Sequence, residues 1–254
     1  MVKEVKDSTN MGRPILRSPC SKIRKRTSNI IQDIPRELLI EILSRTAQTS
    51  FTDIHNAKLS CKDFHEASED THVYRHMSLD NIPLVPWTPL TEKQQAFLTK
   101  CKDCQNPDIA YRQAVLDYFT GERPESAPGH ILRALDSNHI GALYVTCIIL
   151  LFSGDDGLKA CGMKLMVGMK KCRYVRTKLK EHRHKLQRML RLMWVKNPAL
   201  RRRPVCCTRQ DNHKRKRGWV DNDDIDDEQD DVHSCEACSV DSEIKFLVSS
   251  LPQL

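Results

Sequence analysis

The amino-acid sequence predicts an all-α protein: three short helices near the N-terminus, a short array of paired helices, and charged segments at both ends. Two observations support this fold class. Apolar residues recur at helical spacing from residue 34 onward. In addition, the stretch around residue 111 matches the stretch around residue 144, at an offset of 33 residues. A period of that size, built from two helices, is typical of repeat proteins.

The first predicted helix covers residues 34–45. Pro35 suits the first helical position, where its missing N–H costs nothing. Glu37 places a negative charge beside the positive end of the helix dipole. The apolar positions recur at helical spacing, namely Ile34, Leu38, Leu39, Ile42 and Leu43. So wide an apolar face on one short helix requires a partner.

Two further short helices follow the first. After a turn at residues 48–50, the second helix carries Ala57, Leu59, Cys61 and Phe64. A third segment, residues 73–79, begins Val-Tyr after Asp70. Taken in order, these blocks resemble an F-box over about residues 31–79, with Ile34 in place of the usual Leu and Thr46 at a commonly apolar position. An ordinary helical hairpin with a proline start is the alternative.

The F-box resemblance implies a partner and a role. Members of that family dock a Skp-family adaptor, and through it a cullin, as substrate-recognition subunits of SCF-type E3 ubiquitin ligases. Other subunits transfer the ubiquitin, so the resemblance implies that the chain is not an enzyme. By position, the residues that form or support the docking surface are Ile34, Pro35, Leu38, Leu39, Ile42, Leu43, Leu59, Cys61, Phe64 and Tyr74.

The internal repeat predicts the second domain. Tyr111 pairs with Tyr144, and the later matches are Ala114 with Cys147, Leu116 with Ile149, Phe119 with Phe152, and Gly121 with Gly154. Each glycine is expected to end the first helix of its unit, and the second helices are expected at 129–137 and 157–170. This pattern resembles a degenerate Sel1-type or tetratricopeptide-type array, with coincidence as the alternative. An F-box followed by such repeats and a Cys-rich end resembles a group of plant F-box proteins.

These patterns divide the chain into five parts. Residues 1–28 are expected to be a disordered basic tail and residues 29–80 an F-box. Residues 81–90 form a proline-rich linker, and residues 91–200 the repeat domain, which recruits an unknown protein target. Residues 201–254 are expected to be a charged, cysteine-containing tail.

A basic segment, residues 170–196, offers a function of a different class. It reads as one amphipathic helix in which leucines alternate with many Lys and Arg residues, and Trp194 is expected at its buried edge. Such a helix can bind calmodulin, anionic lipid or nucleic-acid phosphate. The favoured interpretation is a capping helix that closes the repeat array and points its charges toward water, so we expect no nucleic-acid partner.

No catalytic motif or cofactor is expected, and the question of zinc stays open. The six possible ligands are Cys206, Cys207, His213, His233, Cys235 and Cys238. Residues 235–238 have the Cys-x-x-Cys spacing of a zinc half-site, but adjacent Cys206 and Cys207 are poorly placed to share one ion. An ordinary set of thiols is the favoured interpretation.

Composition and charge suggest where the protein resides. The chain has a net charge of +8 and eleven cysteines, which are expected to be reduced because no signal peptide is recognisable. The longest apolar run, residues 140–152, is too short to span a bilayer, so no membrane partner is expected. Short basic clusters at 22–26 and 214–217 suggest an intracellular protein of nucleus and cytoplasm.

Overall fold

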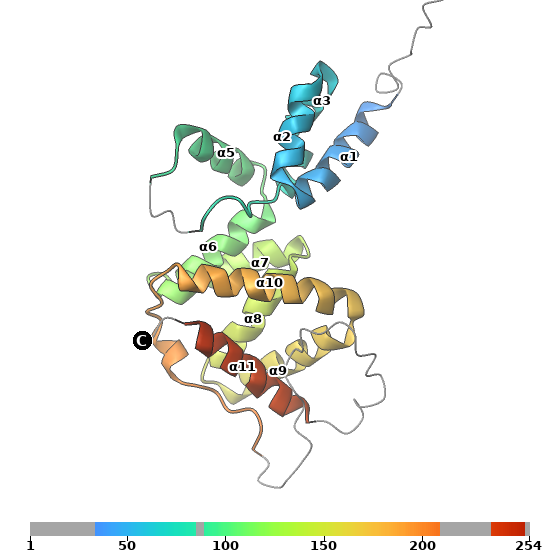
Figure 1. Ribbon diagram of the computed structural model, residues 1–254. Coiled ribbons are helices and arrows are strands. Elements are labelled where there is room, and N and C mark those ends of the chain that lie inside the picture. Colours follow the sequence, from blue (N-terminus) through green and yellow to red (C-terminus); the bar gives the residue numbers. More distant parts are fainter. Residues whose placement is uncertain (1–33, 85–88, 209–234, 252–254) are drawn as a thin grey trace, which may run out of the picture. The chain divides into compact units, whose positions relative to one another are not determined.

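The protein is all-α within the residues that the structure describes, as the sequence predicts. The computed structural model describes residues 34–84, 89–208 and 235–251, and its α-helices and one 3-10 helix lie in these ranges (Figure 1). The chain divides into a short unit, residues 1–35, and a large unit, residues 36–254, that contains every described helix. No helix in the described ranges has the length and apolar character needed to cross a membrane.

The N-terminal part of the large unit contains four short helices. These are α1 (Arg36–Thr49), α2 (Phe51–Ser60), α3 (Lys62–Ser68) and α4 (Thr71–His76). The expected second helix is divided at Cys61, whose backbone is extended and whose sulfur accepts the amide of Phe64. These helices bury a small core of their own, made of Leu39, Leu43, Ala47, Ile54, Ala67, Val73 and Tyr74.

The repeat is visible in the backbone as well as in the sequence. It comprises α5 (Glu92–Asp103), α6 (Pro107–Thr120), α7 (Ala127–Asp136), α8 (Ile140–Phe152) and α9 (Asp156–Lys171). Gln105 and Asn138 lie 33 residues apart, and both have a left-handed backbone, with φ of 57° and 56°. The residues after them, Asn106 and His139, both cap the next helix through their side chains. The same turn therefore joins α5 to α6 and α7 to α8, which confirms a helical repeat.

Glycine ends α6 at a position where another residue would be strained. Gly121 has a φ of 72°, and a Cβ added there would lie 3.0 Å from the backbone of Asn197. Gly154, its counterpart in the repeat, also has a positive φ, of 82°. The expected role of both glycines at the ends of the first helices fits these conformations.

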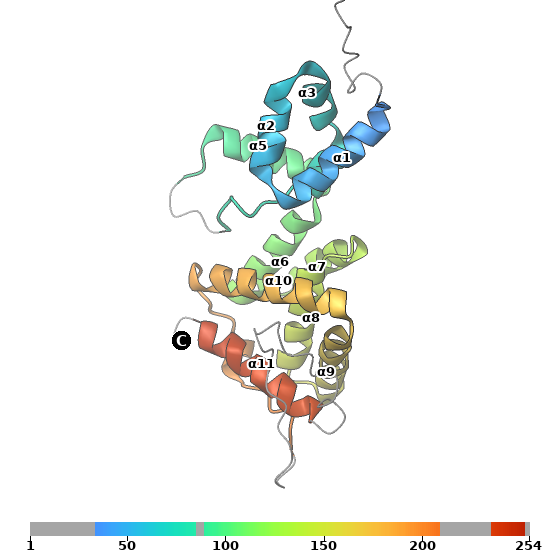
Figure 2. The same ribbon diagram turned by 45° about the vertical axis from the view of Figure 1, so that its right-hand side comes forward.

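Two further helices complete the core of the repeats. The sequence predicted one helix from residue 170, but the chain turns at Cys172, so α10 runs from Arg173 to Arg191. Figures 1 and 2 show α10 lying across α8, and α11 (Glu236–Ser250) lying beside α9. Buried leucines of α10 enter the same core as the repeat aromatics, namely Leu179, Leu186 and Leu190. The predicted capping role of the basic helix agrees with this packing.

The expected C-terminal tail contains one of these core helices. Val240, Ile244 and Leu247 lie on one face of α11 and are buried in the repeat core. The charged residues around this helix concealed its short apolar stripe. Residues 209–234 of the expected tail, like the expected basic N-terminal tail, lie outside the described residues. The prediction that Trp194 is buried was wrong, since 71% of it is exposed.

One cation of α10 faces the interior, contrary to the expectation that its charges point to water. Arg183 is 5% exposed, and its Nε donates to a carboxylate oxygen of Glu243 on α11 at 2.7 Å. The same oxygen accepts the hydroxyl of Tyr144 from α8. Burial, and after it the Glu243 charge, holds the pKa of Tyr144 well above its usual value. A buried charge requires such a partner, so this contact ties α8, α10 and α11 together.

Candidate adaptor-docking surface and its junction with the repeats

The ten predicted docking residues fall into three groups. Four are exposed, namely Pro35, Leu38, Ile42 and Leu59. Three are buried in the core of α1–α4, namely Leu39, Leu43 and Tyr74. Ile34, Cys61 and Phe64 are half-buried. The buried residues can support a docking surface but cannot contact a partner directly.

We use the name apolar face for the large exposed apolar residues of α1 and α2 taken together, namely Leu38, Ile42 and Leu59. Their exposed fractions are 56%, 51% and 71%. Leu38 and Ile42 lie one turn apart on α1 and so share one side of the helix. Leu59 is near the end of α2, which packs against α1.

Charged groups adjoin Leu38 and Ile42 on the exposed side of α1. Arg45 donates to the Glu41 carboxylate at 2.8 Å, and His72 of α4 lies 3.4 Å from the same carboxylate. The hydrogen bond from Arg45 lowers the pKa of Glu41. Helix α1 thus presents a buried side and an exposed side on which apolar and charged residues lie next to one another.

Helix α5 supports the α1–α4 core through an aromatic cluster that the sequence analysis did not anticipate. The Phe97 ring lies edge-on to Phe51, with centroids 5.1 Å apart, and 6.2 Å from the Tyr74 ring. The ammonium of Lys100 sits 4.2 Å from the centre of the Tyr74 ring, a favourable cation–π placement. Lys58, Lys100 and the Tyr74 hydroxyl all contact Glu69. The sequence predicts residues 91–103 only as part of the repeat domain, and no local signal points to these contacts.

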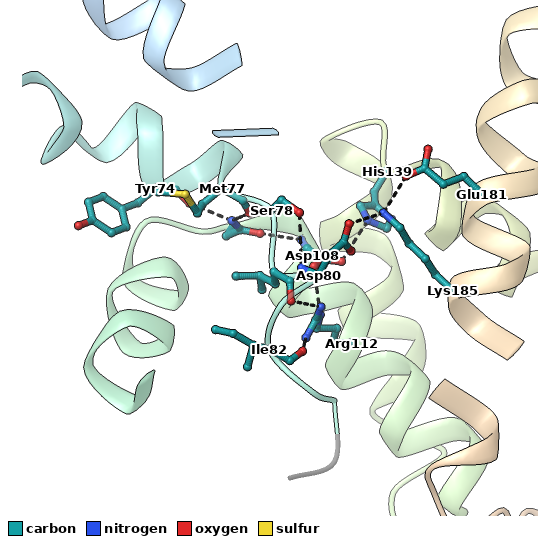
Figure 3. A network of polar contacts seen from close by, with 12 residues as sticks. Tyr74, Met77, Ser78, Asp80, Ile82, Asp108, Arg112, His139, Glu181 and Lys185 are labelled. Carbon is teal, nitrogen blue, oxygen red and sulfur yellow. Dashed lines mark hydrogen bonds and ion pairs between the residues drawn. The ribbon is translucent and has the colours of Figure 1, made fainter. Parts of the chain in front are cut away.

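The segment after α4 is attached to α6 by hydrogen bonds to its backbone carbonyls (Figure 3). The side-chain amide of Asn106 donates to the carbonyls of Tyr74 and Met77, at 2.8 and 2.9 Å. The Arg112 guanidinium donates to the carbonyls of Leu79 and Ile82, at 2.5 and 2.6 Å. Tyr74 lies in the last turn of α4, and the other three residues follow that helix. The carbonyls of Tyr74 and Leu79 also accept backbone amides, from Met77 and Ile82. The two side chains therefore add donors to carbonyls at and just after a helix end, where helical partners run out.

We call the contacts between the end of α4, the segment after it and α6 the junction. Charged groups extend the junction to α10. Lys185 lies between Asp80, at 2.8 Å, and Glu181, at 2.9 Å (Figure 3). Asp108 orients Arg112 through a 3.0 Å contact and lies 3.5 Å from His139. Burial by itself raises the pKa of Asp108, but the hydrogen bond from His139 and the Arg112 charge outweigh it and lower the pKa. The junction therefore joins the end of α4 to two repeat helices by paired, partly buried charges.

The zinc candidates of the sequence analysis are only partly brought together. The sulfur atoms of Cys207, Cys235 and Cys238 lie within 4.8 Å of one another. The Cys206 sulfur is not part of this cluster, while His213 and His233 lie outside the described residues. The backbone amide of Cys238, and to a lesser degree the neighbouring thiols, lower the pKa of Cys235 to about 7.

Comparison with known proteins defines the class of both parts. Residues 31–80 match a family model described as F-box-like, and residues 79–191 match one described as plant tetratrico peptide repeats. The chain therefore carries an F-box-like domain followed by plant tetratricopeptide repeats. The Sel1-type assignment finds no support in these matches.

Two curated relatives come from Arabidopsis thaliana. One, a putative F-box protein, is 25% identical over 179 residues, which cover 70% of this chain and 59% of the relative. The other, an F-box protein, is 29% identical over 125 residues, which cover 49% of this chain and 75% of the relative. The chain thus spans less than two thirds of the length of the first relative. No solved structure matches the chain significantly.

Proposed function

We propose that this protein is a substrate-recognition subunit of an SCF-type ubiquitin ligase. Helices α1–α4 dock a Skp-family adaptor and through it a cullin, and the repeat helices recruit a protein target. Ubiquitin transfer is left to other subunits, so the chain itself is not an enzyme. The observation that carries this proposal is the apolar face of Leu38, Ile42 and Leu59 within an F-box-like domain.

Exposing the apolar face to water costs free energy. An exposed leucine is ordinary when it stands alone, but exposed apolar residues on one side of a helix, as Leu38 and Ile42 are, indicate a contact surface. Burying a large aliphatic side chain gains roughly 1.5–3 kcal/mol relative to full exposure. Leu38 and Ile42 are about half exposed, so each gains a fraction of that on binding. A groove on the adaptor that covers this face would supply the missing partner of α1.

A hollow near the end of α6 is the best candidate for target contact. It has a volume of about 300 Å³, and its lining includes Leu116, Asp117, Thr120, Met193, Trp194 and Lys196. Exposed Trp194 stands at this hollow with adjacent acidic and basic groups. Tryptophan is enriched where proteins bind one another. A Trp194→Ala variant that keeps the adaptor but loses co-purifying proteins from plant extract would support this assignment.

A binding assay with a purified Skp-family adaptor tests the docking proposal. The variant Leu38→Glu/Ile42→Glu changes only exposed positions, so the α1–α4 core stays intact. We expect the adaptor affinity to fall by at least about 2 kcal/mol, roughly thirtyfold, because charges then enter an apolar contact. Leu39 is unsuitable for this purpose, because it is 4% exposed and a charge there would disrupt the fold.

Leu132 provides the matched control. It is 60% exposed on α7, outside the F-box-like domain, so Leu132→Glu introduces the same charge on a comparable surface. This variant should bind the adaptor as the wild type does. Equal adaptor recovery by the wild type and by folded Leu38→Glu/Ile42→Glu would refute the docking proposal.

The alternative function through the basic helix has a specific structural obstacle. The leucines of α10 that a calmodulin-type partner would grasp are fully buried, namely Leu179, Leu186 and Leu190. Its exposed cations are still available to phosphate groups, and such binding weakens steeply as salt rises.

Localisation to nucleus and cytoplasm is likewise a proposal. The two basic clusters that suggest it, at 22–26 and 214–217, lie outside the described residues. Imaging of the tagged full chain tests it.

A further inference from the structure

We propose that Cys207, Cys235 and Cys238 form a thiolate site for a tetrahedral metal ion of the zinc class. The site is separate from the apolar face and does not depend on adaptor docking. It lies where the segment after the 3-10 helix (Pro198–Arg201) meets the start of α11. Three observations carry the proposal: the distances between the sulfurs, the way each cysteine is positioned, and the packing of α11.

The sulfur positions suit a tetrahedral ion better than a disulfide. Two ligands on a zinc ion with Zn–S bonds of about 2.3 Å lie about 3.8 Å apart. The Cys207 and Cys235 sulfurs are 3.7 Å apart, and all three sulfurs lie within 4.8 Å of one another. A disulfide requires about 2.05 Å. The three thiolates occupy three positions of the ion and leave one for a further ligand.

Local structure positions Cys235 and Cys238 in the same direction. Cys235 is the residue before the first turn of α11, and Cys238 lies within that turn. Residues three apart at a helix start lie on one side of it, which is why Cys-x-x-Cys pairs serve as two ligands for one ion. The dipole of the helix also favours negative charge at this end.

A separate contact brings the third thiol to the pair. Both oxygens of the Asp241 carboxylate accept backbone amides, from Cys206 at 2.7 Å and from Cys207 at 3.0 Å. Asp241 lies one turn along α11 from Cys238, so the contact holds Cys207 against the start of the helix. The adjacency of Cys206 and Cys207, which had argued against a site, is harmless here because only Cys207 contributes a sulfur.

The packing of α11 explains what a metal would stabilise. The helix supplies Val240, Ile244 and Leu247 to the repeat core. Cys235, directly before the helix, lies 28 residues after Cys207 in the sequence. Ordering so distant a segment costs conformational entropy. An ion held by both sides of this junction would close that loop and keep α11 on the repeats.

Metal analysis of the purified full chain under reducing conditions tests the site. We expect about one zinc ion per chain, and cobalt added after chelation should give thiolate-to-cobalt charge-transfer absorption. Chelation should lower the melting temperature, and added zinc should restore it. This part uses the wild type only, so it does not depend on a variant that folds. Absence of bound zinc together with absence of the cobalt signal would overturn the proposal.

Cysteine variants separate this site from other thiols. Cys207→Ser and Cys235→Ser/Cys238→Ser should lose the ion and the chelator-dependent change in melting temperature. Cys206→Ser is the matched control beside the site, and Cys161→Ser changes an exposed thiol elsewhere. Both controls should keep the ion. Retention of the metal by folded Cys207→Ser, or a Cys207–Cys235 disulfide in the protein as purified under reducing conditions, would contradict the assignment.

Discussion

The F-box-like helices and the repeat helices differ in how much of their apolar surface they bury. In α6–α11 most of the large apolar side chains belong to one extensive core, with Phe119, Leu179 and Leu186 fully buried, while a few such as Leu132 and Tyr174 are exposed. In α1–α4 the core is small, and Leu38, Ile42 and Leu59 face solvent. The same residue types therefore stabilise the fold in one region and are available for binding in the other. Composition alone does not distinguish these roles, since burial decides between them.

The largest expected effect is on the repeat core. Phe119→Ala should lower the free energy of unfolding by about 3–5 kcal/mol, because the side chain is 0% exposed and its removal leaves a cavity. Urea denaturation followed by circular dichroism measures the loss. A change below about 1 kcal/mol would show that this core tolerates cavities and would weaken the contrast with α1–α4.

A second effect comes from His182, a half-buried histidine of α10. Burial, reinforced by the nearby charges of His139 and Lys185, lowers the pKa of His182 from 6.5 to about 4. Because the folded state holds the ring neutral, the stabilisation is present above pH 6.5 and is lost as the pH falls toward 4. The loss is at most about 3 kcal/mol, at 1.36 kcal/mol for each pKa unit.

Unfolding free energies measured across this pH range check the prediction. Glu181 and Asp108 also lie near the ring and oppose the lowering of its pKa. A variant is therefore needed to show that His182 causes the pH dependence of the unfolding free energy. His182→Gln should flatten the pH dependence, whereas His65→Gln on the exposed surface of α3 should leave it unchanged. An identical slope in all three proteins would exclude His182 as its source.

A smaller effect is expected at the junction between the regions. Asn106→Ala removes the hydrogen bonds to the carbonyls of Tyr74 and Met77 and the side-chain cap of α6. We expect a loss of about 2 kcal/mol, since a lost cap costs about 1 kcal/mol and buried carbonyls lose their donors. Thermal melting of the wild type and Asn106→Ala measures the loss, and equal melting temperatures would show that these contacts do not stabilise the junction.

The smallest effect on stability is expected at the apolar face. Leu38→Ala should change the free energy of unfolding by no more than about 0.5 kcal/mol, because the side chain is 56% exposed. Adaptor affinity should nevertheless fall measurably in a titration. If Leu38→Ala destabilised the fold as strongly as Phe119→Ala, the division between fold-stabilising and binding residues would be incorrect.

The sequence by itself determined the elements with local signals. Pro35 and Glu37 marked the start of α1, and the 33-residue match predicted paired helices that recur in the structure at Gln105 and Asn138. Helix spacing also marked the buried leucines of α10. These features follow from propensity and periodicity, which act over a few residues and can be read along the chain.

Only the tertiary structure decided which apolar residues are covered and which distant groups meet. Leu38 and Leu39 are adjacent and chemically identical, yet one is exposed and the other buried. Arg183 lies in a basic helix, but Glu243 on α11 neutralises it in the interior. Cys207 approaches Cys235 only because Asp241 and the α11 core hold the two segments together. Burial and long-range charge pairing depend on the packing of whole elements, and no local pattern encodes them.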